Sequence, residues 1–538
     1  MAYASSALFS SIPRLIVSAE SGGGGKTLVS LGLTRAFTKL GFAVKAFKKG
    51  PDYIDAAWLG HAARFPATNL DLFFLDQAQI QKLFLEALSL RLNKEPKILA
   101  IVEGNRGLFD GLDRDGSCST SELARDLCLP ILLTLDCTKA TRTMAAIVEG
   151  IVNFEDGLEF AGLILNRVGT KRQEELLRQV LEHYTGLPVL GVLPRLHENL
   201  LPERHMGLAS FGHMLSVDLD LRLDKISQFI GQNVDLEALL SRVNKLRQQL
   251  PKHLWPEAIE IPSIGSKSLA TFFSLHGTED EDFGPQTSKI GQGCAADLGP
   301  KHAPFEHNLG DQAYFTNLEI KPKPTLAVVL DKSLWFYYPE NWQALDKAGA
   351  NLRFISLLDD FERFDGLYLG GGFPEDFAQD LSQSASLAKI KKLALDGLPI
   401  YAECGGFMVL AKSLEVAGIK YPMANVFDVD VQFCPKPQGL GYIRGEIITP
   451  NPYFPKGSKL KGHEFHYSKC HWQGEPKFAI RLTRGQGMGI GANQNYDGLV
   501  FQNVWASYTH IWAESYPNWA KNFVAQACQY AVSRRLNF

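Results

Sequence analysis

A glycine-rich turn near the start of the chain constrains the fold more than any other stretch. Residues 15–18 form a short apolar run, residues 19–27 read AESGGGGKT, and an apolar-periodic run extends to residue 40. This order is typical of a phosphate-binding loop, because glycines let backbone N–H groups close around a phosphate and a helix N-terminus adds a favourable dipole. The residues expected to bind the nucleotide are Gly23, Gly25, Lys26 and Thr27. Lys26 would reach the outer phosphates, and the Thr27 hydroxyl would bind Mg²⁺.

One residue departs from the usual pattern of such loops. The pattern places a glycine where this chain has Glu20. A carboxylate there would repel a polyphosphate unless its side chain points outward. The glycine run is also compatible with a plain flexible turn, but the order of strand, Gly-Lys-Thr and helix favours the nucleotide site.

Length and composition bound the class of protein. The 538 residues are too many for one core, so we expect at least two domains. Hydrophobic content of 45%, charged content of 21% and a net charge of −3 indicate an ordinary globular protein and argue against a nucleic-acid binder. The eight cysteines form no Cys-x-x-Cys pair, which favours reduced thiols. With neither a signal peptide nor a membrane span in the sequence, we expect a cytoplasmic protein that does not bind membranes.

The first half of the chain alternates short apolar runs with amphipathic segments. The predicted strands are residues 15–18, 43–47, 98–102, 131–135, 162–165 and 189–192, and the clearest predicted helices are 77–92 and 171–183. This alternation indicates a parallel sheet that is covered by helices on both faces. Ligands of such sheets bind beyond the carboxyl ends of the strands, so the polar residues there are the candidates for a site.

Four acidic residues follow these strands or lie in the turns after them. They are Asp52, Asp55, Glu103 and Asp110, and Asn166 follows a further strand. One such carboxylate is most often a helix cap or a turn former. Four of them facing a phosphate-binding loop favour a Mg²⁺ site, because Mg²⁺ prefers hard oxygen ligands beside phosphates.

A second centre lies at Cys404. The apolar run before it ends at Glu403, and Gly405-Gly406 opens a helical pattern after it. This strand–nucleophile–helix elbow exposes a side chain on a tight turn, where we expect the helix dipole to lower the thiol pKa and backbone N–H groups to hold an oxyanion. The glycine-rich loop 370–374 could complete that hole. The other cysteines resemble small hydrophobic core residues.

A thiolate nucleophile needs a base, and three histidines are candidates: His463, His466 and His510. Between the two halves, residues 251–323 are polar, glycine-rich and aperiodic, which indicates a linker or insertion.

Several segments together resemble the cobyrinic acid a,c-diamide synthase family. They read KKGPDYID at 48–55, NLD at 69–71, EGNRGLFDG at 103–111, LPERHMGL at 201–208, YAECGGFM at 401–408, GHEFH at 462–466 and SYTH at 507–510. The resemblance extends from about residue 14 to the C-terminus, apart from the linker. It implies an α/β protein with a P-loop NTPase-type domain (1–250), a linker (251–323) and a flavodoxin-like class I glutamine amidotransferase domain (324–538).

The resemblance also implies an activity and site roles. The family amidates tetrapyrrole acetate groups with ammonia from glutamine, using ATP and Mg²⁺, and its members act on small molecules, with a homodimer left open. The roles carried over are Cys404 as nucleophile and His510 as base, Asp52, Asp55 and Glu103 as catalytic, Thr27, Asp52 and Glu103 as metal ligands, Asn166 at the nucleotide, and Tyr53, Asp110, Arg204 and His205 at the substrate. His463 and His466 are expected to be structural or communicating residues.

Two alternatives stay open at this point. One is amidation of another tetrapyrrole, such as sirohydrochlorin, nickel-sirohydrochlorin or sirohaem. The other is a non-catalytic P-loop partner, which Glu20 and Leu28 would suggest. A third departure concerns the glutaminase half, where Trp512 stands two residues after the base, at the position of the usual glutamate.

Overall fold

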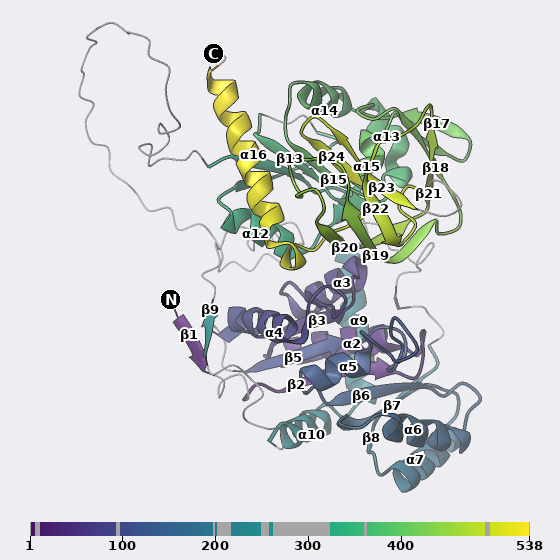
Figure 1. Ribbon diagram of the computed structural model, residues 1–538. Coiled ribbons are helices and arrows are strands. Elements are labelled where there is room, and N and C mark those ends of the chain that lie inside the picture. The colour runs from purple at the N-terminus through teal and green to yellow at the C-terminus, as the bar shows by residue number, and fades with distance from the viewer. Residues whose placement is uncertain are drawn as a thin grey trace, which may run out of the picture.

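The computed structural model describes residues 2–5, 11–92, 97–196, 200–201, 217–248, 258–261, 323–359, 363–489 and 495–536. These residues form two α/β units, an N-terminal one in purple to teal and a C-terminal one in green to yellow (Figure 1). Most of the predicted linker lies outside the described residues. Within it, β9 (Ala258–Ile261) pairs antiparallel with β1 (Ala2–Ser5). The exact domain limits stay a prediction.

Within the described residues, the N-terminal unit is built on a seven-stranded parallel sheet of order β4-β3-β5-β2-β6-β7-β8. Its strands are β2 (Arg14–Ala19), β3 (Ala43–Lys49), β4 (Thr68–Leu70), β5 (Ile98–Glu103), β6 (Ile131–Asp136), β7 (Phe160–Val168) and β8 (Val189–Pro194). All six predicted strands are confirmed. The sequence missed β4, because its three residues are too few to show a pattern.

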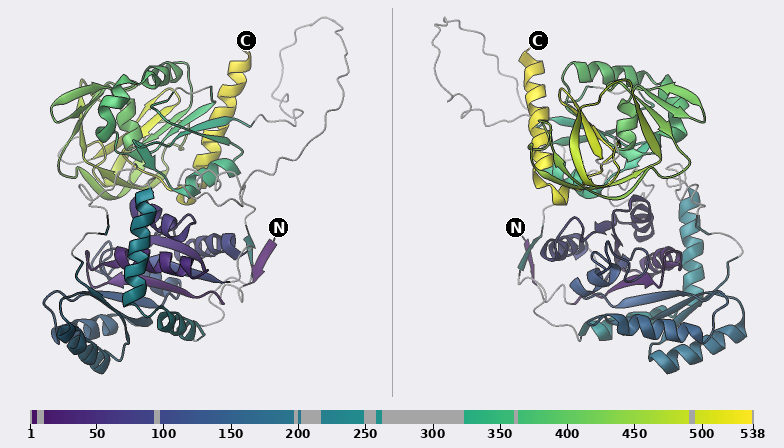
Figure 2. Two further views of the ribbon diagram at one scale, coloured as in Figure 1. Left: turned by 180° about the vertical axis from the view of Figure 1, so that it is seen from behind. Right: turned by 45° about the vertical axis from the view of Figure 1, so that its right-hand side comes forward.

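Helices cover both faces of this sheet (Figure 2). They are α2 (Lys26–Lys39), α3 (Tyr53–Ala63), α4 (Gln77–Leu92), α5 (Thr120–Asp126), α6 (Thr143–Phe154), α7 (Lys171–Thr185), α9 (Val217–Asn233) and α10 (Leu236–Gln248). Side chains of β2 alternate between two cores: Leu15 and Val17 join the core under α2 and α9, and Ile16 joins the core under α4 and α5. None of the described helices is long and apolar enough to cross a membrane.

The C-terminal unit has a nine-stranded sheet in its described part, of order β12-β10-β13-β15-β24-β23-β22-β19-β20. Its strands are β10 (Thr325–Val329), β12 (Asn351–Ile355), β13 (Gly366–Leu369), β15 (Ile400–Glu403), β19 (Gly439–Ile447), β20 (Lys459–His466), β22 (Phe478–Arg484), β23 (Tyr496–Phe501) and β24 (Val504–Ser507). The strands from β12 to β24 pair in parallel, and pairing is antiparallel from β24 onward. The parallel part is the predicted flavodoxin-like core.

The smaller elements of this unit surround that sheet. They are β11 (Leu334–Phe336), β14 (Gly371–Gly372), β16 (Ser413–Val416), β17 (Ile419–Pro422), β18 (Val429–Phe433), β21 (Ser468–Trp472), α12 (Pro339–Lys347), α13 (Ala378–Gln383), α14 (Ala385–Leu395), α15 (Gly405–Leu410), α16 (Pro517–Leu536) and the short 3₁₀ helices η2 (Pro374–Phe377) and η3 (Ala513–Ser515).

The second half also suggests alternating strands and helices from its apolar runs, but this is wrong for residues 413–507, where strand follows strand. Turn chemistry is the physical reason. Between β16 and β17, Ala417 and Gly418 both have positive φ, 52° and 80°. Two such residues make the tight hairpin turn that joins neighbouring antiparallel strands.

The two units contact each other through β19, β20 and the loop after β4. Tyr442 on β19 donates a hydrogen bond of 2.8 Å to Asp71 Oδ2, and its ring stacks on Phe73 at 4.2 Å between centroids. The Arg444 guanidinium group also packs over Phe73, 4.9 Å from the ring centroid. Burial raises the pKa of Asp71 to about 6. The buried Asp71 carboxyl group therefore depends on the Tyr442 hydroxyl as its hydrogen-bond donor across the contact.

Replacing Tyr442 with Phe tests this contact. We expect the variant to lose about 1.5–3 kcal/mol of unfolding free energy, because the hydrogen bond goes to a buried carboxylate. Denaturant unfolding of the full chain measures it. Tyr421→Phe, on β17 and away from the contact, is the matched control. Equal stability of both variants and the parent chain would contradict the role given to Tyr442.

Candidate active sites

The glycine-rich turn forms the predicted phosphate-binding loop. It connects β2 to α2, and Gly25 at the helix N-cap has φ 100°. A Cβ at Gly25 would overlap with the Asn166 amide, which donates a 3.0 Å hydrogen bond to Gly24 O. Glycine at position 25 therefore leaves room for Asn166, at the end of β7, to form a hydrogen bond with the loop. Asn166 lies at the loop as predicted, and its contact with a nucleotide stays a prediction.

The two residues that open α2 are both engaged within the protein. Lys26 Nζ donates to Ser21 O at 2.9 Å, and Thr27 Oγ1 donates to Glu103 Oε1 at 2.7 Å. Burial lowers the pKa of Lys26, and the nearby charge of Lys48 adds to this effect. A bound polyphosphate would offer this ammonium a stronger, charged acceptor than the Ser21 carbonyl.

The Glu20 carboxylate is fixed to the sheet. Its Oε1 accepts a 2.9 Å hydrogen bond from the backbone N–H of Asp136, at the end of β6. The departure from the usual loop pattern therefore ties the phosphate-binding loop to the neighbouring strand.

A buried network of charges lies beside the loop. Lys48 Nζ is 2.8 Å from Asp55 Oδ2 and 2.9 Å from Glu103 Oε1. Burial alone would lower the pKa of Lys48, but Asp55 and Glu103 outweigh it and raise that pKa. A lysine at this edge of the sheet could hold a substrate carboxylate, but two carboxylates of the chain itself already neutralise Lys48.

Asp52 begins α3. Its Oδ1 accepts hydrogen bonds from the N–H groups of Ile54 (3.0 Å) and Asp55 (2.9 Å). Burial, and then repulsion from Asp55, raise the pKa of Asp52. The structure therefore brings the predicted residues Asp52, Asp55 and Glu103 together around Lys48, while their catalytic roles stay predictions.

The residues at this site fit a Mg²⁺ ion. Glu103 Oε2 is buried without a hydrogen-bond partner among the described residues, and Oε1 already contacts the Thr27 hydroxyl. Among the described residues there is no cluster of three or more His, Cys, Asp or Glu that could hold a metal alone. This suits Mg²⁺, which usually binds one or two carboxylates and completes its shell with phosphates and water.

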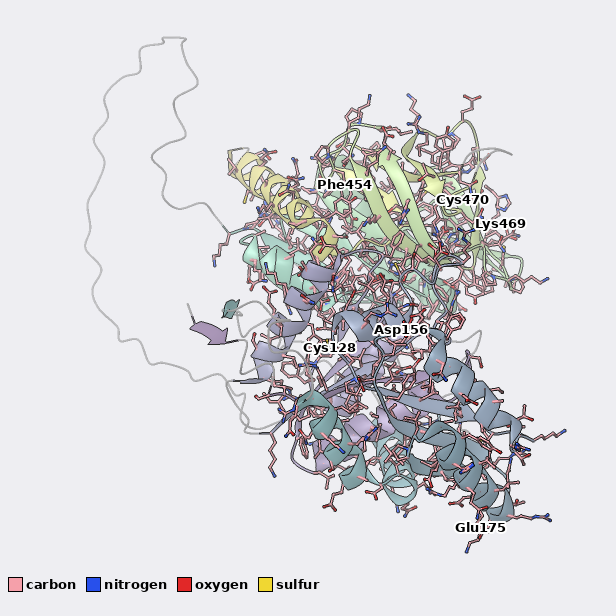
Figure 3. The ribbon with its side chains drawn as sticks, turned by 60° about the horizontal axis from the view of Figure 1, so that its bottom comes forward. Cys128, Asp156, Glu175, Phe454, Lys469 and Cys470 are labelled. Atoms are coloured by element: carbon pink, nitrogen blue, oxygen red, sulfur yellow. The ribbon has the colours of Figure 1, made fainter. Side chains whose placement is uncertain are left out.

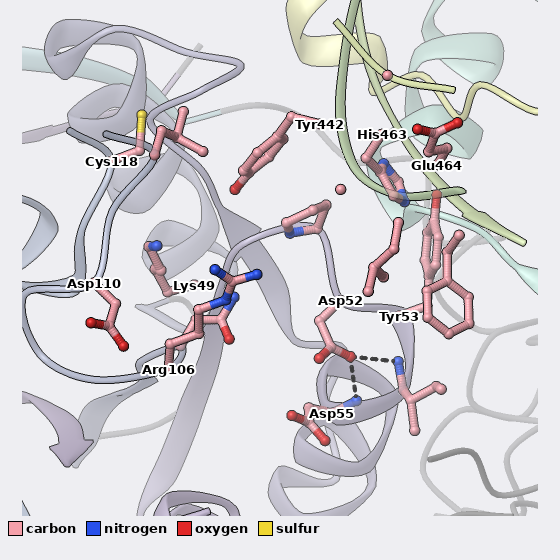
Figure 4. A pocket seen from close by; sticks show the side chains of 18 of the residues that line it. Lys49, Asp52, Tyr53, Asp55, Arg106, Asp110, Cys118, Tyr442, His463 and Glu464 are labelled. Atoms are coloured by element: carbon pink, nitrogen blue, oxygen red, sulfur yellow. Dashed lines mark hydrogen bonds between the residues drawn. The ribbon is translucent and has the colours of Figure 1, made fainter. Parts of the chain in front are cut away.

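A cavity of about 650 Å³ opens next to this network, between the two units. The N-terminal unit contributes Lys49, Asp52, Tyr53, Arg106 and Asp110 (Figure 4), and the C-terminal unit contributes Tyr442, His463 and Arg484. Asp110 Oδ2 also accepts a 2.8 Å hydrogen bond from Gly107 N. The predicted substrate residues Tyr53 and Asp110 thus share one cavity. Arg204 and His205 lie outside the described residues.

In the C-terminal unit, Cys404 occupies the predicted elbow between β15 and α15. Its φ of 48° and ψ of −104° are the strained backbone of a nucleophile turn. The thiol lies 3.4 Å from Phe465 O, and the Cys404 N–H donates to Ser507 O at 2.7 Å. The elbow therefore holds the sulfur in one place.

The expected depression of the Cys404 pKa is wrong for this state of the protein. Cys404 is only 2% exposed, and burial raises its pKa well above the usual value. The carboxyl group of Glu375 adds to the effect, and the Gly405 N–H opposes it without reversing it. The thiol therefore needs a base to remove its proton.

His510 is fully buried, close to the contact between the two units. Its Nδ1 lies 3.7 Å from Glu403 Oε2, and its ring stacks on His463 with centroids 4.8 Å apart. Burial, then the neighbouring His510, hold the pKa of His463 well below its usual value, so His463 is neutral. Sequence reasoning missed Glu403 as a site residue. Its signal was a charged residue inside a buried strand, directly before the nucleophile.

Two aromatic residues connect the two sites. Tyr53, on the first turn of α3, lies 5.4 Å from the rings of both His463 and His510. Trp512 packs against Phe74 (5.8 Å) and so contributes to the contact between the units. His466 stacks on Tyr508 at 3.7 Å, away from this contact.

The other described cysteines do not share the environment of Cys404. Cys128 lies in the N-terminal unit and Cys470 on β21, far apart in Figure 3. Cys137 is buried, as expected for a small hydrophobic residue, but Cys118, Cys128, Cys434, Cys470 and Cys528 are only partly buried. The general expectation of buried core cysteines is therefore wrong for most of them.

Comparison with known proteins agrees with this arrangement. Residues 15–208 match the model of the CobQ/CobB/MinD/ParA nucleotide binding domain, and residues 325–517 match that of the CobB/CobQ-like glutamine amidotransferase domain. A cobyrinate a,c-diamide synthase of Magnetococcus marinus is 35% identical over 95% of this chain and 96% of its own length. One of Caldanaerobacter subterraneus is 31% identical, over 96% and 98%.

A P-loop nucleotide-binding unit joined to a glutamine amidotransferase unit defines a class, the glutamine-hydrolysing carbon–nitrogen ligases, and this chain is such an enzyme. Within that class, the chain belongs to the cobyrinate a,c-diamide synthase family. The alternative of a non-catalytic P-loop partner is thereby set aside.

The raised pKa of Cys404 predicts its reactivity without glutamine. At neutral pH the thiol is protonated, so alkylation by iodoacetamide should be slow. It should speed up only as the pH passes the usual thiol value of about 8.5, because the thiolate is the reactive form. Mass spectrometry of the labelled peptides measures this, with partly buried Cys434 as internal reference. Faster labelling of Cys404 than of Cys434 at pH 7 would contradict the raised pKa of Cys404.

Proposed function

We propose that this chain converts the a and c acetate groups of a cobyrinic-acid-type tetrapyrrole into amides, with ATP and glutamine as co-substrates. The observation that carries the proposal is the cavity shared by the two units. One wall holds Asp52 and Asp55, next to the phosphate-binding loop, and the other holds His463, which stacks on His510. The substrate class is inferred from the related cobyrinate a,c-diamide synthases.

Glutamine is the source of nitrogen, and Cys404 is the proposed nucleophile. His510 takes the thiol proton as the sulfur attacks the side-chain amide, and returns it to the departing nitrogen as ammonia. Water then hydrolyses the thioester to glutamate. Because burial disfavours the thiolate, we propose that proton transfer to His510 accompanies the attack on glutamine.

The carboxylate partner needs activation, since a carboxylate has a poor leaving group. Transfer of the terminal phosphoryl group of ATP would give an acyl phosphate, from which ammonia displaces phosphate. Lys26 and the backbone N–H groups of the loop would stabilise the charge that develops on the transferred group. Mg²⁺, held by Thr27 and Glu103 with Asp52 close by, would neutralise charge on the phosphates.

The cavity suits a large polycarboxylate. Its volume of about 650 Å³ lies within the range of small-molecule sites. Lys49, Arg106 and Arg484 bring positive charge to its wall, where they could hold the carboxylates that are not reacting. Tyr53 and Asp110 would contact the substrate on the side of the N-terminal unit. Tyr53 lines this cavity and also lies 5.4 Å from the rings of His463 and His510, so ammonia released beside His510 would form close to the cavity.

The two half-reactions should be separable. Cys404→Ser should lower glutamine-dependent amidation by about 10⁴-fold or more, because the nucleophile is lost. It should keep amidation with ammonium salt at high pH, since the carboxylate-activating residues lie in the other unit. Glu103→Gln and Lys26→Ala should fail with either nitrogen source. Product mass, measured with each source, distinguishes these outcomes.

Cys434→Ser is the matched control and should behave like the parent chain with both nitrogen sources. A Cys404→Ser protein that still uses glutamine would refute the nucleophile. Normal synthesis by both Glu103→Gln and Lys26→Ala would refute the nucleotide site. Parallel incubation with sirohydrochlorin, nickel-sirohydrochlorin and sirohaem tests the substrate class, and preference for one of them would overturn the choice of cobyrinic acid.

A further inference from the structure

We propose that Glu403 is the positioning residue of His510 and replaces the carboxylate that class I glutaminases usually carry two residues after the base. The inference deepens the proposed function and rests on its assignment of Cys404 and His510. In this chain the usual position is occupied by Trp512, whose ring packs against Phe74 of the other unit. The carboxylate therefore comes from a different place in the sequence, directly before Cys404, and still lies beside the base.

The geometry points the carboxylate at one nitrogen of the base. Glu403 Oε2 lies 3.7 Å from His510 Nδ1. This distance is too long for a hydrogen bond at rest, but catalytic contacts often shorten only when substrate binds. With Nδ1 facing Glu403, Nε2 is left to accept the thiol proton.

Burial makes this contact strong when His510 becomes charged. Glu403 is 1% exposed and His510 is 0% exposed. Among the described residues, His510 is the only basic side chain within 4 Å of Glu403. Two opposite charges interact far more strongly in such surroundings than in water. The imidazolium that forms as Cys404 loses its proton therefore finds its counter-ion already in place.

Neighbouring groups hold Glu403 in this position. Its Oε1 accepts a 3.0 Å hydrogen bond from Ile511 N, and its Oε2 accepts one of 3.2 Å from the Tyr368 hydroxyl. Asn341 donates to that hydroxyl and to Ile511 O, both at 3.2 Å. Glu403 is thus bound to the residue that follows the base, and the carboxylate and the imidazole are fixed by one network.

The other groups around His510 do not offer a competing counter-ion. His463 stacks on the ring and stays neutral because its pKa is depressed. Tyr53 approaches from the other unit, and burial raises its pKa, so it too stays neutral. Gly371 packs so close to the ring that a Cβ there would overlap with Cε1. Glu403 is therefore the group that can compensate the charge.

The Sγ–H bond of Cys404 breaks, its proton passes to His510 Nε2, and the electron pair on sulfur forms the bond to the glutamine carbonyl carbon. His510 then gives this proton to the leaving nitrogen, which departs as ammonia. The carboxyl group of Glu403 exchanges no proton in this step.

The test compares glutamine hydrolysis by Glu403→Gln, Glu403→Asp and Tyr368→Phe in the full chain. We expect Glu403→Gln to lower kcat by about 10²-fold or more with little change in KM. The acid side of its pH profile should shift to lower pH, because a neutral amide stabilises the imidazolium less. Glu403→Asp should recover part of kcat, and Tyr368→Phe should lower kcat by less than Glu403→Gln, because Glu403 keeps its carboxylate and its hydrogen bond from Ile511 N. Glu415→Gln, on β16, is the matched control.

The outcomes separate this inference from the proposed function. If Cys404→Ser and His510→Ala abolish glutamine hydrolysis while Glu403→Gln keeps the parental kcat and pH profile, only the inference is overturned. A folded Glu403→Gln protein with lower stability but an unchanged pH profile also overturns it, because a merely structural role would act that way. If Glu403→Gln does not fold, Glu403→Asp decides: a parental kcat and pH profile refute the role. If His510→Ala still hydrolyses glutamine, the proposed function itself fails.

Discussion

The buried charge network around Lys48 holds the start of α3 in place, and the position of the two sites relative to each other depends on it. Lys48 on β3 binds Asp55 on α3 and Glu103 on β5, and Glu103 in turn accepts the hydrogen bond of Thr27. Removing one partner of such a buried pair usually destabilises a protein by about 3–5 kcal/mol, because it leaves an uncompensated charge. The network therefore fixes the start of α3 against the phosphate-binding loop.

The start of α3 is also where the two units meet. Asp52 caps the helix, and the next residue, Tyr53, reaches the paired rings of His463 and His510. A shift of α3 by substrate or nucleotide would therefore be felt at the glutaminase base through direct contact. In the resting protein, burial keeps the Cys404 thiol protonated.

Much of this could be read from the sequence, for physical reasons that differ between the halves. The N-terminal sheet is parallel and buried on both faces, so its strands appear as continuous apolar runs that end at their ligand side. The loop at Lys26 and the elbow at Cys404 depend on local glycines and are equally visible. The hairpins of residues 413–507 were missed, because their signal is short and depends on the turn residues, such as Ala417 and Gly418.

Contacts between distant segments could not be predicted in the same way. The sequence does not tell whether Lys48 binds substrate or pairs within the protein, and only its distances to Asp55 and Glu103 show that it is already paired. Likewise, Trp512 suggested an incomplete glutaminase, since nothing in a linear pattern tells that Glu403 faces His510 from another strand. The roles of Lys48 and Glu403 follow from contacts that form only in the tertiary fold.

The central claim is that nitrogen passes from glutamine to substrate carboxylates within this one chain. The most direct measurement is the product mass after incubation with cobyrinic acid, Mg-ATP and glutamine carrying ¹⁵N in its side-chain amide, in the presence of unlabelled ammonium at neutral pH. The account predicts a diamide in which both new nitrogens are ¹⁵N. An unlabelled diamide, or no amide at all from a folded, ATP-binding protein, would contradict it.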